Sequence, residues 1–102
     1  MTNNFKNLFD LQNKNVVITG ANGFLGRVYS EAISQMGANP IMLDINSTRI
    51  NNFIKKIKLT NKNNPTFYKC DISKKNNIVQ VFNKIKKKYK KIDALVNNAA
   101  LN

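Results

Sequence analysis

The sequence predicts an α/β fold in which a parallel, doubly wound sheet carries helices on both faces. Short apolar, often β-branched runs alternate with longer segments whose apolar residues recur every three or four positions, and no hairpin signal separates neighbouring strands. The predicted order is β-α-β-α-β-α-β, and helical crossovers of this kind connect parallel strands. At 102 residues the chain has room for one domain.

Four segments are predicted as strands, each closed by a turn residue. The first, at residues 15–19, is a β-branched run that ends at Gly20, as expected for a strand buried on both faces. The second begins at Pro40, where the sheet needs no N–H donor. The predicted strands are residues 15–19, 40–44, 66–70 and 94–97.

Three segments have helical periodicity. The first, at residues 24–36, is followed by Gly37, a residue type favoured just after a helix end. Ser47 and Ser73 are predicted to be the N-caps of the second and third helices. The predicted apolar stripes are Leu25, Val28, Tyr29, Ala32, Ile33 and Met36; Ile50, Phe53, Ile54 and Ile57; and Ile78, Val81, Phe82, Ile85 and Tyr89.

The strong positive charge has two interpretations. Seventeen Lys and Arg against five Asp and Glu give a net charge of +12, which is typical of some nucleic-acid-binding proteins. Only Arg27 and Arg49 are arginines, however, and arginine is the residue that phosphate recognition favours. Lys, Asn and Ile are in excess, which is typical of an AT-rich genome because their codons are rich in A and T. We favour the compositional interpretation. The lysines around the third helix are then a solvated face rather than a patch for polyanions or membranes.

Several classes of site and targeting signal are excluded or disfavoured by residue content. Cys70 is the single cysteine and there is no histidine, so disulfide frameworks, His-based triads and His-ligated metal sites are absent. No apolar run approaches the length of a membrane helix, and the first residues lack the pattern of a secretory signal. We expect a cytoplasmic location, no membrane contact and no specific nucleic-acid partner.

A glycine-rich segment joins the first strand to the first helix. Residues 19–26 are Thr-Gly-Ala-Asn-Gly-Phe-Leu-Gly. Glycines at such a bend let the backbone approach a pyrophosphate, and the helix N-terminus offers free N–H groups to it. A tight turn without a ligand is the alternative, but the strand before and the helix after favour a phosphate site. The fold class is therefore predicted to be Rossmann-type.

Polar residues follow the other three predicted strands, at the sheet edge where open α/β folds bind ligands. Asp44 comes 24 residues after Gly20, where an acid bonds ribose hydroxyls and repels a 2′-phosphate; a turn-capping aspartate is the alternative. Asp71 and Ile72 are predicted either beside an adenine or in a turn that leads into a helix. Asn97-Asn98-Ala99-Ala100 follows the last strand.

Together these segments resemble the short-chain dehydrogenase/reductase superfamily over nearly the whole chain. Phe9-Asp10-Leu11 and the run from Lys14 to Gly20 resemble the family's opening, and Thr-Gly followed 77 residues later by Asn-Asn-Ala is a specific combination. The resemblance implies a dinucleotide cofactor, NAD in preference to NADP. It implies cofactor-binding roles for Gly20, Asn22, Gly23, Phe24, Leu25, Gly26, Asp44, Asp71, Ile72, Asn97, Asn98 and Ala99.

Two departures from the family pattern affect the expected activity. The spacing of Gly20, Gly23 and Gly26 resembles the extended branch, which acts on sugar nucleotides, whereas Asn-Asn-Ala resembles the branch of alcohol and carbonyl oxidoreductases; Ala100 replaces a usual Gly. We give Asn-Asn-Ala more weight. The family's catalytic Ser and Tyr-x-x-x-Lys are also missing, since Ile33, Ile72 and Asp93 stand four residues after the three tyrosines.

We therefore expect a single partial NAD(P)-binding Rossmann domain at residues 1–102, the cofactor half of an oxidoreductase and inactive alone. A small-molecule substrate and homo-oligomers are expected only of a full-length enzyme. The alternatives are a non-catalytic nucleotide-binding module and a fragment of an extended-branch sugar-nucleotide epimerase or dehydratase. No catalytic residue and no metal ligand is assigned.

Overall fold

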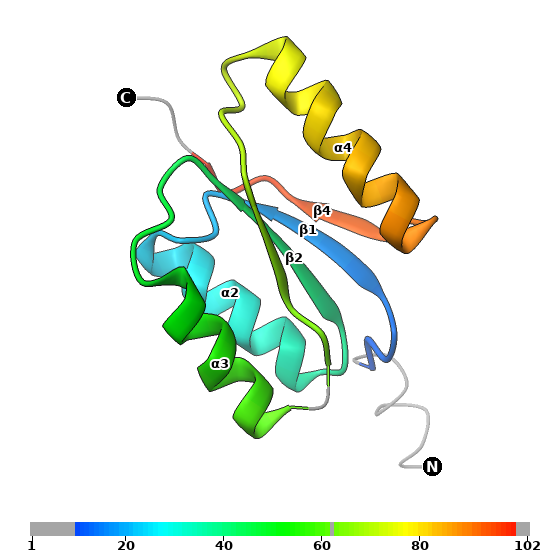
Figure 1. Ribbon diagram of the computed structural model, residues 1–102. Coiled ribbons are helices and arrows are strands. Elements are labelled where there is room, and N and C mark those ends of the chain that lie inside the picture. The colour runs from blue at the N-terminus through cyan, green and yellow to red at the C-terminus, as the bar shows by residue number, and fades with distance from the viewer. Residues whose placement is uncertain (1–9, 62, 100–102) are drawn as a thin grey trace.

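The structure, a computed structural model, describes residues 10–61 and 63–99, and within them four strands alternate with three helices (Figure 1). The order predicted from the sequence is confirmed. The elements are β1 (Asn15–Thr19), α2 (Phe24–Gln35), β2 (Asn39–Asp44), α3 (Ile50–Thr60), β3 (Thr66–Lys69), α4 (Lys75–Tyr89) and β4 (Ala94–Val96).

The strands form one parallel sheet in the order β3-β2-β1-β4. Val17 in β1 pairs with Ile41 in β2 on one side and with Leu95 in β4 on the other. The chain moves outward from β1 to β3 and then returns to the far side of β1. The strand order therefore reverses between β1 and β4, which is the position where doubly wound sheets bind ligands.

Helices cover both faces of the sheet: α2 and α3 lie on one face and α4 on the other (Figure 1). Because side chains alternate along a strand, β1 supplies both cores. Ile18 packs with Phe53 and Ile57 of α3, and Val17 packs with Val81 and Ile85 of α4; the two cores form separate clusters. The predicted stripes of α3 and α4 thus face the sheet.

The apolar stripe predicted for α2 is wrong, because most of its residues do not face the sheet. Leu25, Val28, Tyr29, Ala32 and Met36 are exposed, and only Ile33 of this stripe packs against a core. The buried positions of α2 are small: Gly26, Ser30 and Ser34. Small residues let the helix axis lie close to the strands, and the Ser30 hydroxyl donates to the Gly26 carbonyl within the helix, at 2.8 Å.

Both predicted serine N-caps are wrong. Arg49, with a φ of 59°, caps α3, and Lys74 caps α4; neither side chain makes a capping hydrogen bond. Ser47 instead closes a turn, its carbonyl accepting from the Ile50 N–H, and the Ser73 hydroxyl donates to Asp71. Other bounds differ by a residue: β2 begins at Asn39, while α2, β3 and β4 end one residue earlier than predicted.

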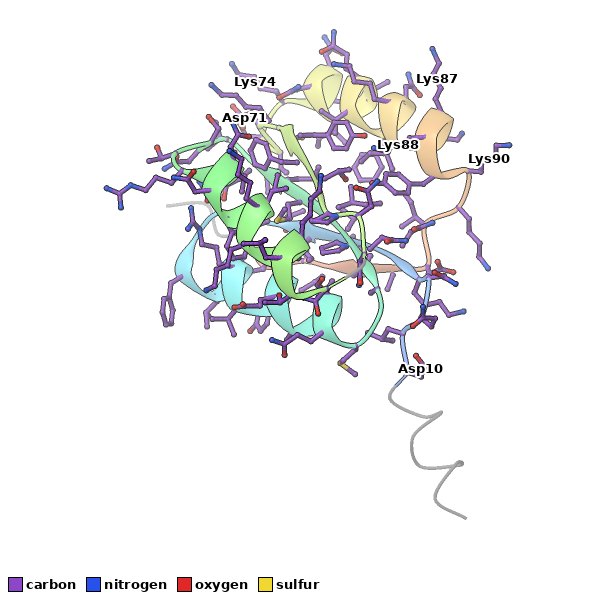
Figure 2. All side chains as sticks on the ribbon, turned by 60° about the horizontal axis from the view of Figure 1, so that its bottom comes forward. Asp10, Asp71, Lys74, Lys87, Lys88 and Lys90 are labelled. Atoms are coloured by element: carbon purple, nitrogen blue, oxygen red, sulfur yellow. The ribbon has the colours of Figure 1, made fainter. Side chains whose placement is uncertain are left out.

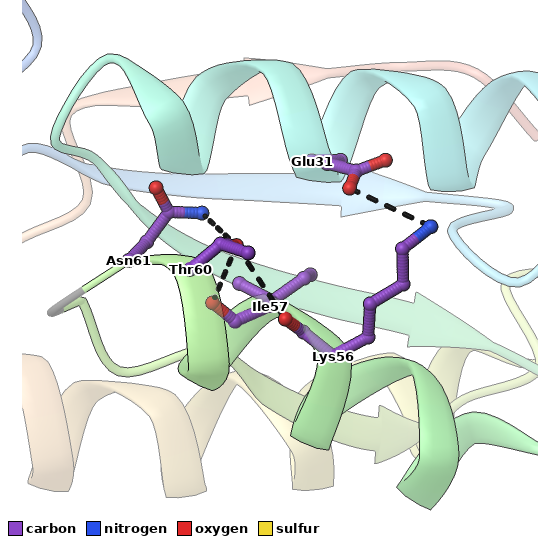
Figure 3. Close-up of polar contacts among 5 residues, drawn as sticks. All are labelled: Glu31, Lys56, Ile57, Thr60 and Asn61. Atoms are coloured by element: carbon purple, nitrogen blue, oxygen red, sulfur yellow. Dashed lines mark hydrogen bonds and ion pairs between the residues drawn. The ribbon is translucent and has the colours of Figure 1, made fainter.

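An ion pair on the surface joins α2 to α3. Glu31 Oε2 lies 3.7 Å from Lys56 Nζ, with both side chains partly exposed (Figure 3). The end of α3 is closed nearby, where the Thr60 hydroxyl donates to the Ile57 carbonyl and the Asn61 amide donates to that hydroxyl. A pair this exposed contributes little to stability, so the packing of α3 on the sheet holds this layer.

Lysines project outward from α4 and its two ends, where Lys74, Lys87, Lys88 and Lys90 stand at the surface (Figure 2). Lys86, Lys87 and Lys88 occupy the last turn, where the helix dipole favours cations. The adjacent strand β4 is exposed at Ala94 and Leu95. Among the residues that the structure describes, no helix has the length and apolar character needed to cross a bilayer.

Candidate functional site

A cavity of about 460 Å³ opens at the carboxyl ends of the strands. It lies at the reversal of strand order, between the turn after β1 and the segment after β4. The turns after β2 and β3 close its other side. Its lining residues are Gly20, Gly23, Phe24, Leu25, Leu43, Asp44, Ile45, Cys70, Asp71, Ile72, Asn98 and Ala99.

The turn after β1 brings backbone rather than side chains to this cavity. Gly20 has a φ of +63°, and a Cβ there would lie 2.9 Å from the Cα of Ala99. A Cβ on Gly26 would lie 2.1 Å from the Gly20 carbonyl oxygen, so the first turn of α2 packs directly on the bend. Any larger residue would separate the helix from the strand. The bend therefore aims the start of α2 at the cavity.

The N-terminus of α2 has donors to spare. Its N-cap is Gly23, which has no side chain to satisfy them, and the first turn holds no acidic residue. The first N–H groups of a helix have no partner within the helix. Phe24 and Leu25 line the cavity and are 83% and 52% exposed, so this turn is open to a ligand.

Thr19 joins the end of β1 to the segment after β4. Its hydroxyl oxygen accepts the N–H groups of Asn98 and Ala99, both at 3.0 Å. The Asn98 side-chain amide donates to the Gly20 carbonyl at 3.2 Å. The Thr19 hydroxyl itself donates to the Asn97 side-chain oxygen at 3.3 Å. The Asn-Asn-Ala segment thus holds the glycine turn in place. Ala100 lies outside the described residues.

Asp44 ends β2 at the cavity wall, and backbone groups orient its carboxylate. Oδ2 accepts the N–H of Asn22 at 2.8 Å, and Oδ1 accepts the N–H of Asn46 at 2.9 Å. Each carboxylate oxygen can accept a second hydrogen bond. Asp44 is thus held by the glycine turn on one side and by its own following turn on the other, with capacity left for hydroxyl donors.

Asp71 and Cys70 form the wall after β3. The Ser73 hydroxyl, at 2.6 Å, and then the Ser73 N–H lower the pKa of Asp71, so this carboxyl is ionised well below neutral pH. Burial raises the pKa of the Cys70 thiol, and the Asp71 carboxylate adds to the rise. Cys70 therefore contributes a neutral, apolar surface beside a fixed negative charge.

The structure gathers most of the predicted site residues around one cavity. Nine line it, and the three others, Asn22, Gly26 and Asn97, are not among the lining residues. Asn22 turns away from the cavity: its side-chain amide donates to the carbonyls of Asn46 and Thr48. Gly26 and Asn97 act through packing and through Thr19 respectively.

Five residues at or behind the site were missing from the prediction. Leu43, Ile45 and Cys70 line the cavity, Thr19 is the hydrogen-bond hub, and Arg27 holds Asn22. The strand-end residues had a signal, since the carboxyl edge of every strand faces the same cleft in such a fold. Arg27 had none, because Thr48, the partner that ties it to the loop after β2, is 21 residues away in the sequence.

Comparison with known proteins assigns the family. The sequence model of the short chain dehydrogenase family matches residues 14–102. The chain therefore belongs to the short chain dehydrogenase family, as its glycine turn and Asn-Asn-Ala segment indicate.

Individual relatives cover almost all of this chain. It is 34% identical over 101 residues to the short chain dehydrogenase/reductase dpchG of Colletotrichum higginsianum, covering 99% of this chain and 37% of that protein. The crystal structure of 2-keto-3-deoxy-D-gluconate dehydrogenase from Streptococcus agalactiae superposes with a TM-score of 0.84 at 29% identity. The superposition covers 100% of this chain and 38% of that one.

A third relative was solved with a cofactor. The structure of a D-mannonate oxidoreductase, so described provisionally, from Haemophilus influenza with bound NAD superposes with a TM-score of 0.83 at 28% identity, covering 96% of this chain and 35% of that one. The chain thus spans little more than a third of the length of these relatives. It corresponds to the part of the family fold that contains the glycine turn and the first four strands.

Proposed function

We propose that this chain is the dinucleotide-binding part of an NAD(P)-dependent oxidoreductase and that it prefers NAD. One observation carries the proposal: a single cavity at the strand-order reversal is lined by the glycine turn, Asp44, Asp71 and the Asn98–Ala99 pair. The family membership and the NAD bound to a relative with the same fold support it. A small-molecule substrate and homo-oligomers are proposed only of a full-length enzyme. No catalytic residue is proposed within this chain.

The residues present fit such a cofactor. The free N–H groups at the start of α2 suit a pyrophosphate, and the cradle exists because Gly20 and Gly26 leave no room for a Cβ. Asp44 offers acceptor capacity to ribose hydroxyls, and Ile45 and Ile72 line the same cavity with apolar surface suited to an adenine. The bound cofactor would carry the hydride; this chain's residues would hold and orient it.

The preference for NAD rests on charge. A ribose 2′-phosphate at the end of β2 would face the Asp44 carboxylate, and like charges brought together weaken binding. Arg27, a cation close to this position, is bonded to Asn22 and to the Thr48 carbonyl. Arg49 is the other arginine near the turn and the group to suspect if NADP binds well.

The sequence lacks the Tyr-x-x-x-Lys spacing that the family uses for proton transfer. None of the three tyrosines has a lysine four residues later, and hydride transfer to a carbonyl needs a proton donor beside the substrate. We therefore expect cofactor binding without turnover when this polypeptide is assayed with alcohols, ketones or sugar nucleotides. Turnover abolished by a substitution within residues 1–102 would contradict this expectation.

Calorimetric titration of the chain with NAD and with NADP tests the proposal. We expect NAD to bind at least about tenfold more tightly. The isosteric substitution Asp44→Asn serves as the matched variant, and it should narrow the difference by removing the charge. Equal or tighter binding of NADP would overturn the preference. Failure of both nucleotides to bind a chain that is folded by circular dichroism would overturn the dinucleotide assignment itself.

A further inference from the structure

Two side chains, one in the glycine turn and one in the first turn of α2, hold the loop that follows β2. The loop, residues 45–49, connects β2 to α3. The Asn22 side-chain amide donates to the carbonyls of Asn46, at 2.9 Å, and Thr48, at 3.0 Å. Arg27 Nη2 donates to the same Thr48 carbonyl at 3.0 Å. Two loop carbonyls are thereby turned toward α2.

Arg27 also fixes Asn22. Its Nε and Nη2 both donate to Asn22 Oδ1, at 2.9 and 2.6 Å. Its guanidinium carbon lies 5.0 Å from the centre of the Phe53 ring on α3, a distance at which a cation is attracted to the ring face. Nη2 by itself reaches both Asn22 and Thr48, and Nε adds a second bond to Asn22 that the single nitrogen of a lysine does not supply in the same plane. We call Arg27, Asn22 and the Thr48 carbonyl the clamp.

The clamp acts on two cavity-lining residues: Asp44, which ends β2, and Ile45, which begins the loop. The Asn22 N–H and the Asn46 N–H hold the two oxygens of Asp44, and the Thr48 N–H donates to Asn46 Oδ1 at 2.8 Å. Every backbone donor that orients Asp44 therefore belongs to a residue whose side chain or carbonyl the clamp holds. Ile45 lies between Asp44 and Asn46, so its place in the cavity wall follows from theirs.

We propose that Arg27 is a positioning residue for the ribose end of the cofactor, acting through Asn22 and the loop to aim Asp44 before the cofactor binds. Arg27 is not among the residues that line the cavity. The ligand chemistry it serves is the vicinal diol of an unphosphorylated ribose. A cation that contacts Asn22 is also a candidate receptor for a 2′-phosphate, but its Nε and Nη2 already donate to Asn22 and Thr48. This inference rests on the proposed function and adds a residue to it.

Three variants isolate this role. Arg27→Met keeps the apolar stem against Phe53 and removes the charge and the donors. Arg27→Lys keeps the charge and loses the fork. Lys55→Met removes an exposed cation from the neighbouring helix α3 and is the matched control. Circular dichroism and thermal unfolding of each variant establish that it is folded.

The first readout is amide hydrogen exchange in the chain without nucleotide. We expect Arg27→Met to speed exchange at Asn46 and Thr48 by about tenfold or more, because it removes hydrogen bonds from a charged donor. Arg27→Lys should give a smaller increase, and Lys55→Met none. Unchanged exchange in folded Arg27→Met overturns the clamp, whether or not any nucleotide binds.

The second readout compares the affinities for NAD and NADP. If Arg27 positions the site for the unphosphorylated ribose, Arg27→Met should weaken the affinity for NAD by about tenfold and narrow the preference for NAD over NADP. Arg27→Lys should retain part of the affinity that Arg27→Met loses. A direct 2′-phosphate receptor predicts the opposite, a larger loss for NADP, and this result overturns the proposal. If the unaltered chain binds neither nucleotide, the proposed function fails, and the exchange experiment still decides whether the clamp exists.

Discussion

At the scale of single residues, the site depends on positions where a side chain is absent. Gly26 lets the first turn of α2 rest on the carbonyl of Gly20, while Gly23 has ordinary space around it: a Cβ there would lie 3.5 Å from its nearest neighbour. The three glycines of the motif are therefore not equivalent. Gly20 and Gly26 must be glycines because neighbouring backbone approaches them closely. Gly23 is distinguished by its place as the N-cap at the open end of α2.

This difference predicts that substitutions at Gly26 and Gly23 have unequal effects on the free energy of unfolding. Gly26→Val should destabilise the chain by about 3 kcal/mol or more, because the side chain overlaps backbone that has no alternative position. Gly23→Ala should change the free energy of unfolding by less than about 1 kcal/mol, since its φ of −78° suits any residue. Urea denaturation of the two variants measures both values. Equal effects would show that α2 does not pack on the bend as described.

At the scale of elements, Asp93 extends the pairing of β1 and β4 beyond their ends. Asp93 Oδ2 accepts the N–H of Asn15 at 2.8 Å, and the Asp93 N–H donates back to the Asn15 carbonyl at 2.8 Å. Lys91 Nζ lies 3.3 Å from Asp93 Oδ1. The Asn15 N–H, followed by the lysine, lowers the pKa of Asp93. A short strand such as β4 thus gains a fixed start.

A lowered pKa has a definite consequence for stability against pH. The carboxylate stabilises the fold above the ordinary aspartate pKa of about 3.9, and this stabilisation is lost as the pH falls through the lower pKa of the folded state. Asp93→Asn should therefore be less stable than the original chain at pH 7, and the difference should shrink toward pH 2. Thermal midpoints at several pH values measure it. A difference that is the same at all pH values would exclude the carboxylate as its cause.

Helix α4 illustrates how an element can be both well anchored and highly charged. Val81 and Ile85 are buried against the sheet, and exposed lysines stand at its first residue and along its last two turns (Figure 2). The Tyr89 hydroxyl lies 2.7 Å from Thr66 Oγ1, and burial raises the pKa of this tyrosine. The helix therefore reaches β3 through one neutral phenol, while the charge stays in solvent.

At the scale of the whole molecule, α2 carries exposed apolar surface that the described fold leaves uncovered. Phe24, Leu25, Val28, Tyr29 and Met36 are 83%, 52%, 48%, 39% and 37% exposed. Contiguous apolar surface of this kind promotes association between molecules. The outer strand β4, with Leu95 57% exposed, adds an unpaired edge among the described strands.

We expect the chain to self-associate through this surface at high concentration, opposed by its charge of +12. Val28→Gln combined with Met36→Gln should lower the associated fraction in sedimentation velocity. Leu59→Gln is the matched control, because Leu59 is 87% exposed but belongs to α3. If the control lowers association as much as the double variant, general hydrophobicity rather than the α2 surface is responsible.

Some features of this protein were determined by the sequence alone. The alternation of strand and helix patterns predicted a parallel α/β fold, because each type of element needs its own spacing of apolar residues. The glycine turn and Asp44 were predicted from local pattern, because parallel strands place their carboxyl ends at one edge and residues that follow different strands converge there. Asp71 had an equally good interpretation as a turn residue, and Asn98 was assigned a role only through the resemblance to the family.

Other features were decided only by the tertiary structure. The apolar stripe of α2 predicted the wrong face, because Gly26, Ser30 and Ser34 pack closest to the strands and small residues carry no hydrophobic signal. Ser47 and Ser73 have the composition of N-caps, but partners elsewhere determine their geometry. Arg27 was assigned no role from the sequence, since its contacts with Thr48 and Phe53 exist only once α2 and α3 lie side by side on the sheet. Spacing along the chain predicts which residues share an edge or a face, whereas contacts between elements depend on how closely those elements pack.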